Sequence, residues 1–266
     1  EAGVSLETVW NGESPQIFDD NGKPYEVANY GKKSFKNLTL LEATEKSVNT
    51  IYVPLGIAVG PEKVIDAARR AGIPDAVEMV PTPSVVLGVA SPHVLDVASA
   101  YATFAAQGVY AKPFLVVEVG NRNGGVLYKA NPQSQEVFSK DVMADLTYAL
   151  KAVVNGGTGA AALGLGRPAA GKTGTSQSNA SAWFSAYTPQ LAASVALFRD
   201  SASESLNGIG GLNSVTGGTF PARIWTAFMK GALRDEPVMS FPAPSNIGGL
   251  DPVVMTSGGR QSQKKR

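Results

Sequence analysis

One lysine of the sequence is surrounded by glycines and hydroxyl side chains, an arrangement suited to binding an anion. It is Lys172, within the stretch Gly171–Thr175, whose sequence is Gly-Lys-Thr-Gly-Thr. Glycines let the backbone approach a ligand closely, while the ammonium and the threonine hydroxyls can donate hydrogen bonds to it. These residues alone leave two anions open, a phosphate or a carboxylate.

Read towards the N-terminus, this stretch completes a phosphate-binding pattern. Residues Gly166 to Thr173 match the P-loop sequence G-x-x-x-x-G-K-[ST] at every specified position. A P-loop needs an apolar strand before its glycines and a helix beginning at the lysine, so that backbone N–H groups face the phosphates. Here the preceding segment 157–164 is mostly glycine and alanine, and Gly174 would fall in the first turn of the helix. The sequence therefore disfavours a nucleotide-binding enzyme but keeps it as an alternative.

A second polar pair lies far upstream, where two helices are expected to meet. Thr39 and Glu42 have the spacing of a capping box, which predicts a short helix ending just before Ser47. An apolar segment then predicts a further helix from residue 50 to about residue 59. Ser47 and Asn49 occupy the break, and such side chains compete for backbone hydrogen bonds and favour junctions. We expect both side chains to be displayed at a turn.

Hydrophobic spacing and turn residues predict the surrounding elements, which combine helices with antiparallel hairpins. The first 36 residues, rich in Gly, Asn, Asp and Pro, are expected to form loops and turns with little regular structure. Ile224, Trp225 and Phe228 are expected to form the apolar side of the last helix. The expected helices cover residues 61–72, 92–108, 139–155 and 221–233, and the expected hairpins pair 114–119 with 125–128 and 182–187 with 191–198.

Composition excludes several classes of function. The chain has 266 residues, 44% of them hydrophobic, and its net charge of +1 offers no electrostatic reason to bind nucleic acid. No cysteine is present, so disulfides and thiol nucleophiles are excluded. The one histidine, His93, follows Ser91 and Pro92, a typical helix start, and makes neither a histidine-rich metal centre nor a Ser-His-Asp triad. We expect no cofactor, no metal and, without a long apolar run, no membrane span.

In the forward direction, residues 172–174 form a K-T-G element, which is expected on a strand beside a hairpin partner, with a Ser-x-Asn element upstream. Residues 182–198 and the Ser47 to Asn49 triplet supply both features. The chain thereby resembles the transpeptidase domain of class A, bifunctional penicillin-binding proteins, over nearly its whole length and in that family's order. The matching segments are 45–50, 98–105, 171–175, 182–189 and 221–229.

The resemblance implies an α/β (α+β) fold of the serine β-lactamase and penicillin-binding-protein transpeptidase type, an antiparallel sheet flanked by helices plus a helical subdomain. It also implies a reaction, D,D-transpeptidation. A serine attacks the D-Ala-D-Ala carbonyl of a peptidoglycan stem peptide, the terminal D-Ala leaves, and an amine of a neighbouring strand takes the acyl group. β-Lactam antibiotics are the implied inhibitors. The implied location is the cell envelope, at the outer face of the cytoplasmic membrane.

The same resemblance assigns roles to individual residues. Lys172 would bind the donor's terminal carboxylate, with Thr173–Thr175 binding substrate along the same strand edge. The N–H of Thr175 would donate to the oxyanion. Ser47 would relay a proton between Lys172 and the leaving group. Asn49 would hydrogen-bond the substrate amide and hold the catalytic lysine of the family's S-x-x-K element.

That S-x-x-K element, which holds the attacking serine, is the one part of the family pattern not found upstream of Ser47. The only formal match is Ser262 with Lys265, in the basic tail. Glu1 to Ser5 resemble the sequence that follows the family's nucleophile helix. We therefore expect residues 1–257 to be a transpeptidase domain that begins after its catalytic serine, and residues 258–266 to be a tail. A membrane-anchored N-terminal piece with Ser-x-x-Lys is the expected partner.

Three alternatives remain at this point. A penicillin-recognising relative without a nucleophile would act as a binding or scaffolding protein. A serine β-lactamase would need a deacylating glutamate on a loop, which the sequence does not identify. A P-loop enzyme would need magnesium and a nucleotide.

Overall fold

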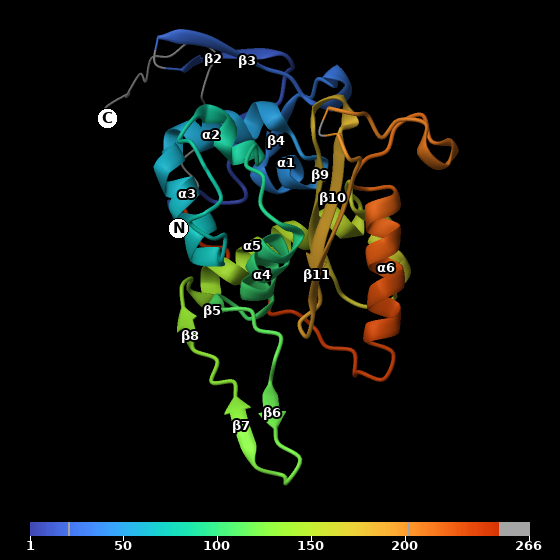
Figure 1. The fold of residues 1–266 in the computed structure, drawn as a ribbon. Helices are drawn as coiled ribbons and strands as arrows, with labels where there is room; N and C mark the ends of the chain where they lie inside the picture. Colours follow the sequence, from blue (N-terminus) through green and yellow to red (C-terminus); the bar gives the residue numbers. More distant parts are fainter. Residues whose placement is uncertain (21, 202, 250–266) are drawn as a thin grey trace.

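The computed structural model describes residues 1–20, 22–201 and 203–249. Its central element is a three-stranded antiparallel sheet with the strand order β11-β10-β9. These strands are β9 (Ala170–Thr175), β10 (Ser181–Tyr187) and β11 (Ala192–Phe198). Helix α6 (Phe220–Ala232) covers one face, and α4 (Val94–Ala105) and α5 (Lys140–Asn155) cover the other (Figure 1). The expected antiparallel sheet between helices is confirmed.

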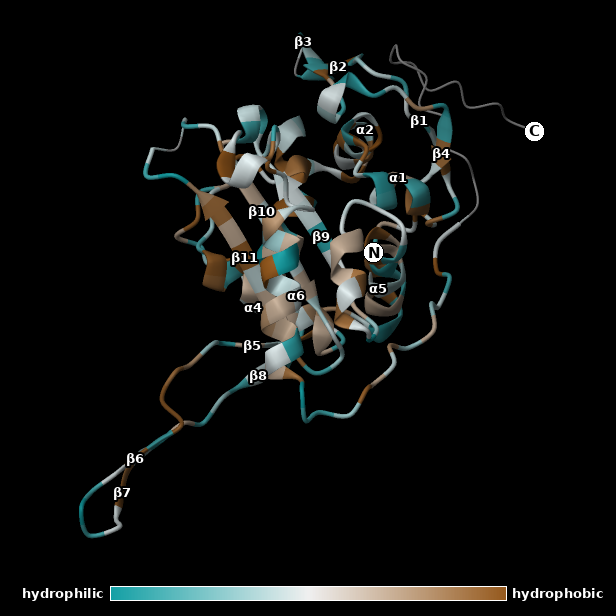
Figure 2. Ribbon diagram, turned by 90° about the vertical axis from the view of Figure 1, so that its right-hand side faces the viewer, coloured by the Kyte–Doolittle hydropathy of each residue, from teal (hydrophilic) through white to brown (hydrophobic). Residues whose placement is uncertain are grey.

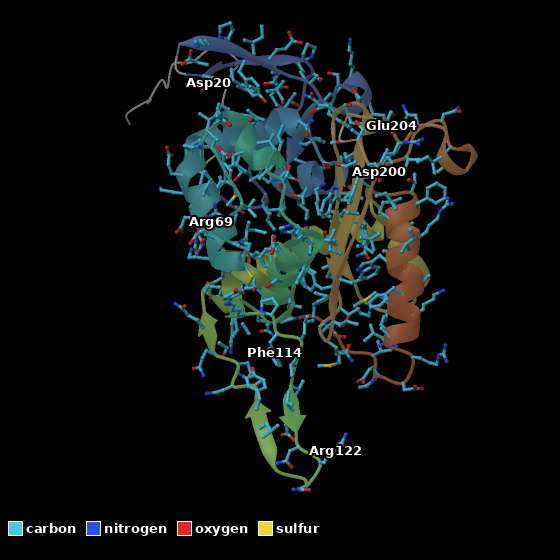
Figure 3. All side chains as sticks on the ribbon, viewed as in Figure 1. Asp20, Arg69, Phe114, Arg122, Asp200 and Glu204 are labelled. Carbon is cyan, nitrogen blue, oxygen red and sulfur yellow. The ribbon has the colours of Figure 1, made fainter. Side chains whose placement is uncertain are left out.

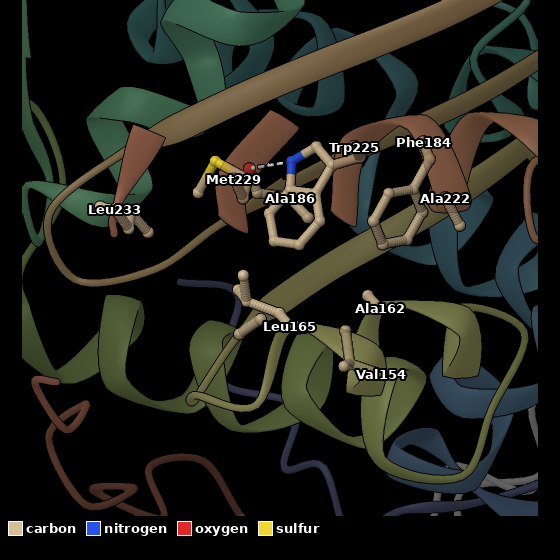
Figure 4. Packing of buried hydrophobic residues seen from close by; sticks show 10 residues of the cluster. Val154, Ala162, Leu165, Phe184, Ala186, Ala222, Trp225, Met229 and Leu233 are labelled. Atoms are coloured by element: carbon tan, nitrogen blue, oxygen red, sulfur yellow. Dashed lines mark hydrogen bonds between the residues drawn. The ribbon is translucent and has the colours of Figure 1, made fainter. Parts of the chain in front are cut away.

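The face of the sheet towards α6 is an apolar core. Phe184 of β10 packs edge-on against Trp225 of α6, with ring centroids 5.4 Å apart, and both side chains are fully buried. Trp225 Nε1 donates to the carbonyl oxygen of Ala186 at 3.2 Å (Figure 4). The 3-10 helix η3 (Ala160–Leu165) contributes two buried side chains to the same core. This packing fixes β10, and through it β9, against α6.

The expected apolar side of α6 is wrong at two positions. Ile224 and Phe228 are 45% and 55% exposed, whereas Trp225 and Met229 are fully buried. The buried side chains recur at helical spacing and define a stripe narrower than the apolar residues would allow. The helix carries more apolar residues than the sheet covers, so packing decides which of them are buried.

The opposite face combines aromatic packing with hydroxyl pairs. Tyr187 of β10 packs against Tyr101 of α4, with ring centroids 6.2 Å apart. Its hydroxyl lies 2.8 Å from that of Thr147 on α5. The predicted start of α5 is confirmed, since Ser139 caps it by accepting from the Val142 N–H. This face therefore contains buried polar side chains, such as the paired hydroxyls of Tyr187 and Thr147.

The predicted start of α4 at Ser91 and Pro92 is wrong. The helix begins at Val94, and His93 is its N-cap residue. The Asp96 carboxylate accepts from the His93 N–H at 2.9 Å, which closes the first turn. The bond to Asp96 thus sets the start of α4, and Pro92 lies outside the helix.

Three consecutive helices make up the helical part beside the sheet. They are α1 (Leu40–Lys46), α2 (Asn49–Val59) and α3 (Pro61–Ala71). The predicted capping box is confirmed: Thr39 Oγ1 accepts from the Glu42 N–H at 3.1 Å, and the Glu42 carboxylate accepts from the Thr39 N–H at 2.9 Å. The chain enters α1 from β4 (Asn37–Thr39), which pairs with β1 (Val9–Asn11).

The expectation of little regular structure in the first 36 residues is wrong. Strands β2 (Gln16–Asp20) and β3 (Lys23–Val27) form an antiparallel hairpin. The sequence carries Asn-Gly at positions 21 and 22, which is a hairpin-turn signal. Gly22 has a φ of +82°, a left-handed value that glycine adopts readily. The 3-10 turn η1 (Tyr30–Lys32) follows the hairpin.

A second hairpin extends away from the body of the molecule (Figures 1 and 2). Phe114 lies near its base and Arg122 at its tip (Figure 3). This hairpin is confirmed, although its strands are shorter than expected and residues 114–117 lie outside them. Its strands are β6 (Glu118–Gly120) and β7 (Val126–Lys129), and a ladder of β5 (Val109–Ala111) with β8 (Ser134–Glu136) joins it to the body.

Within the described ranges, no helix has both the length and the apolar character needed to cross a membrane. The expected boundary between residues 257 and 258, and the basic tail, lie outside the described residues.

Candidate active site at the edge of strand β9

Lys172 lies in the middle of β9, at the edge of the sheet. In the part of the chain that the structure describes, β9 pairs only with β10. Successive residues of an antiparallel strand direct their backbone groups to alternate sides. Because the Ser176 N–H donates to Ser181 O, the backbone groups of Thr173 and Thr175 point away from β10. The outer edge of β9 can therefore hydrogen-bond an extended ligand.

The Lys172 ammonium meets the Ser47 hydroxyl, although 125 residues separate them in the sequence. Nζ donates to Oγ at 2.6 Å. Ser47 directly follows α1 and has φ 57° and ψ 57°. This left-handed conformation costs a residue with a Cβ about 1–2 kcal/mol, and glycine commonly occupies the position. A serine in a glycine-type position suggests that its hydroxyl is used.

Burial governs the charge of Lys172. Desolvation lowers the pKa of its ammonium from 10.5 to about 8, because burial penalises the charged form. Among the described residues no acidic side chain forms an ion pair with it. Its hydrogen bonds go to Ser47 Oγ and, at 3.1 Å, to the Thr173 carbonyl oxygen. At pH 7 the ammonium is charged, and part of the side chain stays accessible to a ligand.

The turn that carries Ser47 is fixed by a loop that sequence reasoning missed. Asn29 is 5% exposed, and its Oδ1 accepts from the Thr50 N–H at 3.0 Å in the first turn of α2. The neighbouring Ala28 carbonyl accepts from Asn49 Nδ2 at 3.0 Å. Asn29 therefore stands in for the N-cap side chain that Val48 cannot supply. No local pattern reveals this, because the bond spans 21 residues.

Hydroxyl groups continue along the β9 edge. Thr173 Oγ1 lies 2.6 Å from the hydroxyl of Thr158, in the loop that follows α5. Thr175 Oγ1 accepts from the Gly217 N–H at 3.2 Å. A Cβ on Gly217 would lie 2.1 Å from the Trp183 carbonyl oxygen, so only glycine allows this approach. The expected site residues on β9 and Ser47 thus share one edge, while the Asn49 side chain is directed to Ala28.

Tyr30 links the segment next to the Ser47 turn with the turn between β9 and β10. Tyr30 of η1 donates to Asn179 Oδ1 at 3.3 Å, and its hydroxyl lies 2.7 Å from Ser214 Oγ. Asn179 lies in the turn between β9 and β10. The bond to Asn179 spans 149 residues, so sequence spacing gave no signal for it.

The position of Lys172 excludes a P-loop. Lys172 lies inside an antiparallel strand, so no helix begins at it. The segment before it forms the 3-10 helix η3 instead of a feeding strand. Without a helix N-terminus facing the lysine there is no array of N–H groups for phosphates. The P-loop alternative is wrong.

Comparison with known proteins gives the family. Residues 89–205 match the model of the penicillin binding protein transpeptidase domain. The structure of the penicillin-binding protein PonA1 from Mycobacterium tuberculosis is similar, with a TM-score of 0.82 and 30% identity over 99% of this chain and 72% of that chain. The chain belongs to the penicillin-binding protein transpeptidase family. The predicted family and its mixed α/β fold are confirmed.

Further relatives place this transpeptidase chain beside class A penicillin-binding proteins. PonA1 in complex with penicillin V matches with a TM-score of 0.80 and 31% identity, over 93% of this chain and 69% of that chain. Penicillin-binding protein 1A of Mycolicibacterium smegmatis is 36% identical over 84% of this chain and 31% of its own length. The chain thus spans about a third of the length of the curated relatives it matches.

Proposed function

We propose that this chain supplies half of the active site of a peptidoglycan D,D-transpeptidase, the half that binds the substrate carboxylate and moves a proton. The observation that carries the proposal is the 2.6 Å hydrogen bond from Lys172 Nζ to Ser47 Oγ. It joins the K-T-G strand to the Ser-x-Asn turn, the pairing that acyl transfer without histidine uses in this family.

In this mechanism Lys172 binds the terminal carboxylate of the donor peptide. Its ammonium has no acidic partner among the described residues, so the carboxylate completes a charge-assisted pair. The hydroxyls of Thr173 and Thr175 bind the same end of the donor. The Thr175 N–H, on the outer edge of β9, donates to the oxyanion of the tetrahedral intermediate. One such donor commonly contributes about 10²–10³-fold in rate.

Ser47 passes a proton to the leaving group. The attacking serine gives its proton to the lysine of its own Ser-x-x-Lys element. When the C–N bond to the terminal D-Ala breaks, that nitrogen takes the proton of the Ser47 hydroxyl, and Lys172 replaces it. The acceptor amine later attacks the acyl carbonyl, and its proton returns to Ser47 and Lys172 while the serine regains its own.

Asn49 orients the substrate and the activating lysine. Its Nδ2 donates to Ala28 O at 3.0 Å, which fixes the side chain and leaves Oδ1 as the acceptor for both groups. The role predicted for Asn49 thus needs only one end of its amide.

The nucleophile is proposed to come from a Ser-x-x-Lys segment outside this sequence. Within it, only Ser262 has a lysine three residues on, and Ser262 lies outside the described residues. Such an enzyme works on stem peptides at the outer face of the cytoplasmic membrane. β-Lactams are its proposed inhibitors, and the PonA1 complex with penicillin V supports this.

The test is covalent labelling with fluorescent penicillin. This chain is combined with the Ser-x-x-Lys segment of the same enzyme as a separate polypeptide, and the labelled piece is identified by gel and mass spectrometry. Label is expected on the added segment and not on this chain, and Lys172→Ala should abolish it. Ser262→Ala is the matched control and should leave labelling unchanged.

Label on a serine of this chain, Ser262 included, would overturn the assignment. Penicillin that protects the pair from thermal unfolding without a covalent adduct would favour a scaffold without a nucleophile. Rapid loss of the label with release of opened antibiotic would favour a serine β-lactamase.

A further inference from the structure

The hydroxyl of Thr158 lies at the candidate active site without any role assigned to it. Thr158 belongs to the loop between α5 and η3, and its Oγ1 is 2.6 Å from Thr173 Oγ1. The residue is exposed, so an incoming ligand can cover it. Thr173, its only side-chain partner among the described residues, is the threonine of the K-T-G element.

The backbone around Thr158 is held on several sides. Its N–H donates to the Glu45 carbonyl oxygen at 3.2 Å, close to Ser47 at the end of α1. A Cβ on Gly157 would lie 2.4 Å from that same oxygen. A Cβ on Gly218 would lie 2.3 Å from the Thr158 carbonyl oxygen. Close approaches of this kind leave the loop little freedom, so the hydroxyl is positioned before any ligand arrives.

Two hydroxyls that share one hydrogen bond can orient it in either direction. If Thr173 donates to Thr158, the Thr173 proton is used and its oxygen would repel an anion. If Thr158 donates to Thr173, the Thr173 proton is free to reach an anion beside Lys172. A carboxylate at that point favours the second order, because each bond in the chain from Thr158 through Thr173 to the anion polarises the next.

We propose that Thr158 is a positioning residue for carboxylate recognition, which turns the Thr173 hydroxyl towards the terminal carboxylate of the donor or of a β-lactam. The inference rests on the proposed function, since it concerns the same ligand group. It adds that recognition of the carboxylate extends beyond β9 into the loop after α5. The effect of Thr158 is expected only with ligands that carry the negative charge.

The test compares a penicillin with its methyl ester, which lacks the charge. Second-order acylation rates are measured on this chain combined with its Ser-x-x-Lys segment. Thr158→Val, which keeps the shape and removes the hydroxyl, should slow acylation by the free acid about 5- to 10-fold, the range of one hydrogen bond. The rate with the ester should stay unchanged. Thr158→Ser, which keeps the hydroxyl, should stay within about twofold of the unsubstituted protein.

A double variant shows whether Thr158 acts through Thr173 or through the stability of the fold. In a Thr173→Val background the Thr158→Val substitution should have no further effect on the free acid, because the two hydroxyls act as one unit. Equal losses with acid and ester, or no loss with either, would overturn the inference and leave the proposed function standing. If the unsubstituted protein is acylated by neither ligand, the proposed function fails, and this inference fails with it.

Discussion

The two faces of the β9–β11 sheet differ in kind. Towards α6 the side chains are apolar, and Trp225 Nε1 donates to two backbone carbonyl oxygens, of Ala186 at 3.2 Å and of Ala193 at 3.1 Å. Towards α4 and α5 the contacts include hydroxyls, with Ser185 and Ser194 paired at 2.7 Å, and the Lys172 ammonium lies on this face. The first face stabilises the sheet, and the second orients polar groups.

Alternation along the strands makes this division possible. Neighbouring residues of a strand point to opposite faces, so Phe184 and Ser185 serve different layers although they are adjacent. Ser185 lies opposite Lys172 in the register, and Phe184 lies opposite Thr173. A substitution in the apolar packing between Phe184 and Trp225 should therefore change stability, whereas one at the Lys172–Ser47 pair on the other face should change chemistry.

The largest effect is expected from Trp225→Ala on the apolar face. Removing a fully buried tryptophan should lower the free energy of unfolding by about 3–5 kcal/mol, because it leaves a cavity and removes the indole donor that two carbonyl oxygens share. Chemical denaturation measures it. Phe228→Ala on the same helix is the control, since Phe228 is 55% exposed and should change stability by only about 0.5 kcal/mol. Equal losses at both positions would contradict the buried stripe assigned to α6.

The next largest effect is expected from substitutions of Ser47, and it should be a loss of acylation rate. Ser47→Ala and Ser47→Gly both remove the acceptor of the Lys172 bond and the proton relay. Each should slow acylation by penicillin about 10²-fold. The two should differ in stability, because at φ 57° glycine avoids a strain of about 1 kcal/mol that alanine keeps. A glycine variant that is both more stable and fully active would show that the hydroxyl has no role.

Local patterns predicted the helix starts around the site. The capping box of Thr39 and Glu42 and the cap of Ser139 each depend on neighbours within a few positions, whereas the strand that carries Lys172 was expected from the K-T-G element. Residues of this kind signal their structure directly in the sequence.

Contacts between residues far apart in the chain could not be predicted from the sequence. Asn29, Tyr30 and Thr158 act through partners 21, 149 and 15 residues away, and none of them stands in a recognisable motif. The predicted burial of Ile224 and Phe228 was wrong for a related reason. Helical spacing shows which apolar residues share a side of α6, but not how many of them the sheet covers. The family resemblance predicted which side chains meet, and the folded chain adds what holds them there.

The pH dependence of acylation should reflect the charge of Lys172. Its pKa of about 8 means that the binding ammonium is lost as the pH rises through that value. The acylation rate with a free acid should fall about tenfold per unit above about pH 8, because the charged form both binds the carboxylate and supplies the relayed proton. Lys172→Arg is the control, because a guanidinium stays charged over this range. A fall centred near 10.5 would show that burial does not lower the pKa.

The same shift has a consequence for stability. Since the pKa of Lys172 is lower in the folded chain than in the unfolded chain, the unfolded chain binds more protons between about pH 8 and 10.5. The contribution of Lys172 to the free energy of unfolding should therefore rise across this window. Comparison of the unsubstituted chain with Lys172→Met by denaturation at several pH values isolates that contribution.

The smallest effect is expected where the sheet meets the rest of the site. Tyr30 joins η1 to the β9–β10 turn through Asn179 and to Ser214, but its side chain is 54% exposed. Tyr30→Phe should therefore lower the free energy of unfolding by at most about 1 kcal/mol and should speed hydrogen exchange of the turn amides several-fold. Tyr25→Phe is the control, since the Tyr25 hydroxyl has no hydrogen bond among the described residues. If exchange at residues 177–180 is unchanged, the turn is held by its other hydrogen bonds, including those of Asn179 with Asn207 and Ser214, and Tyr30 does not couple η1 to it.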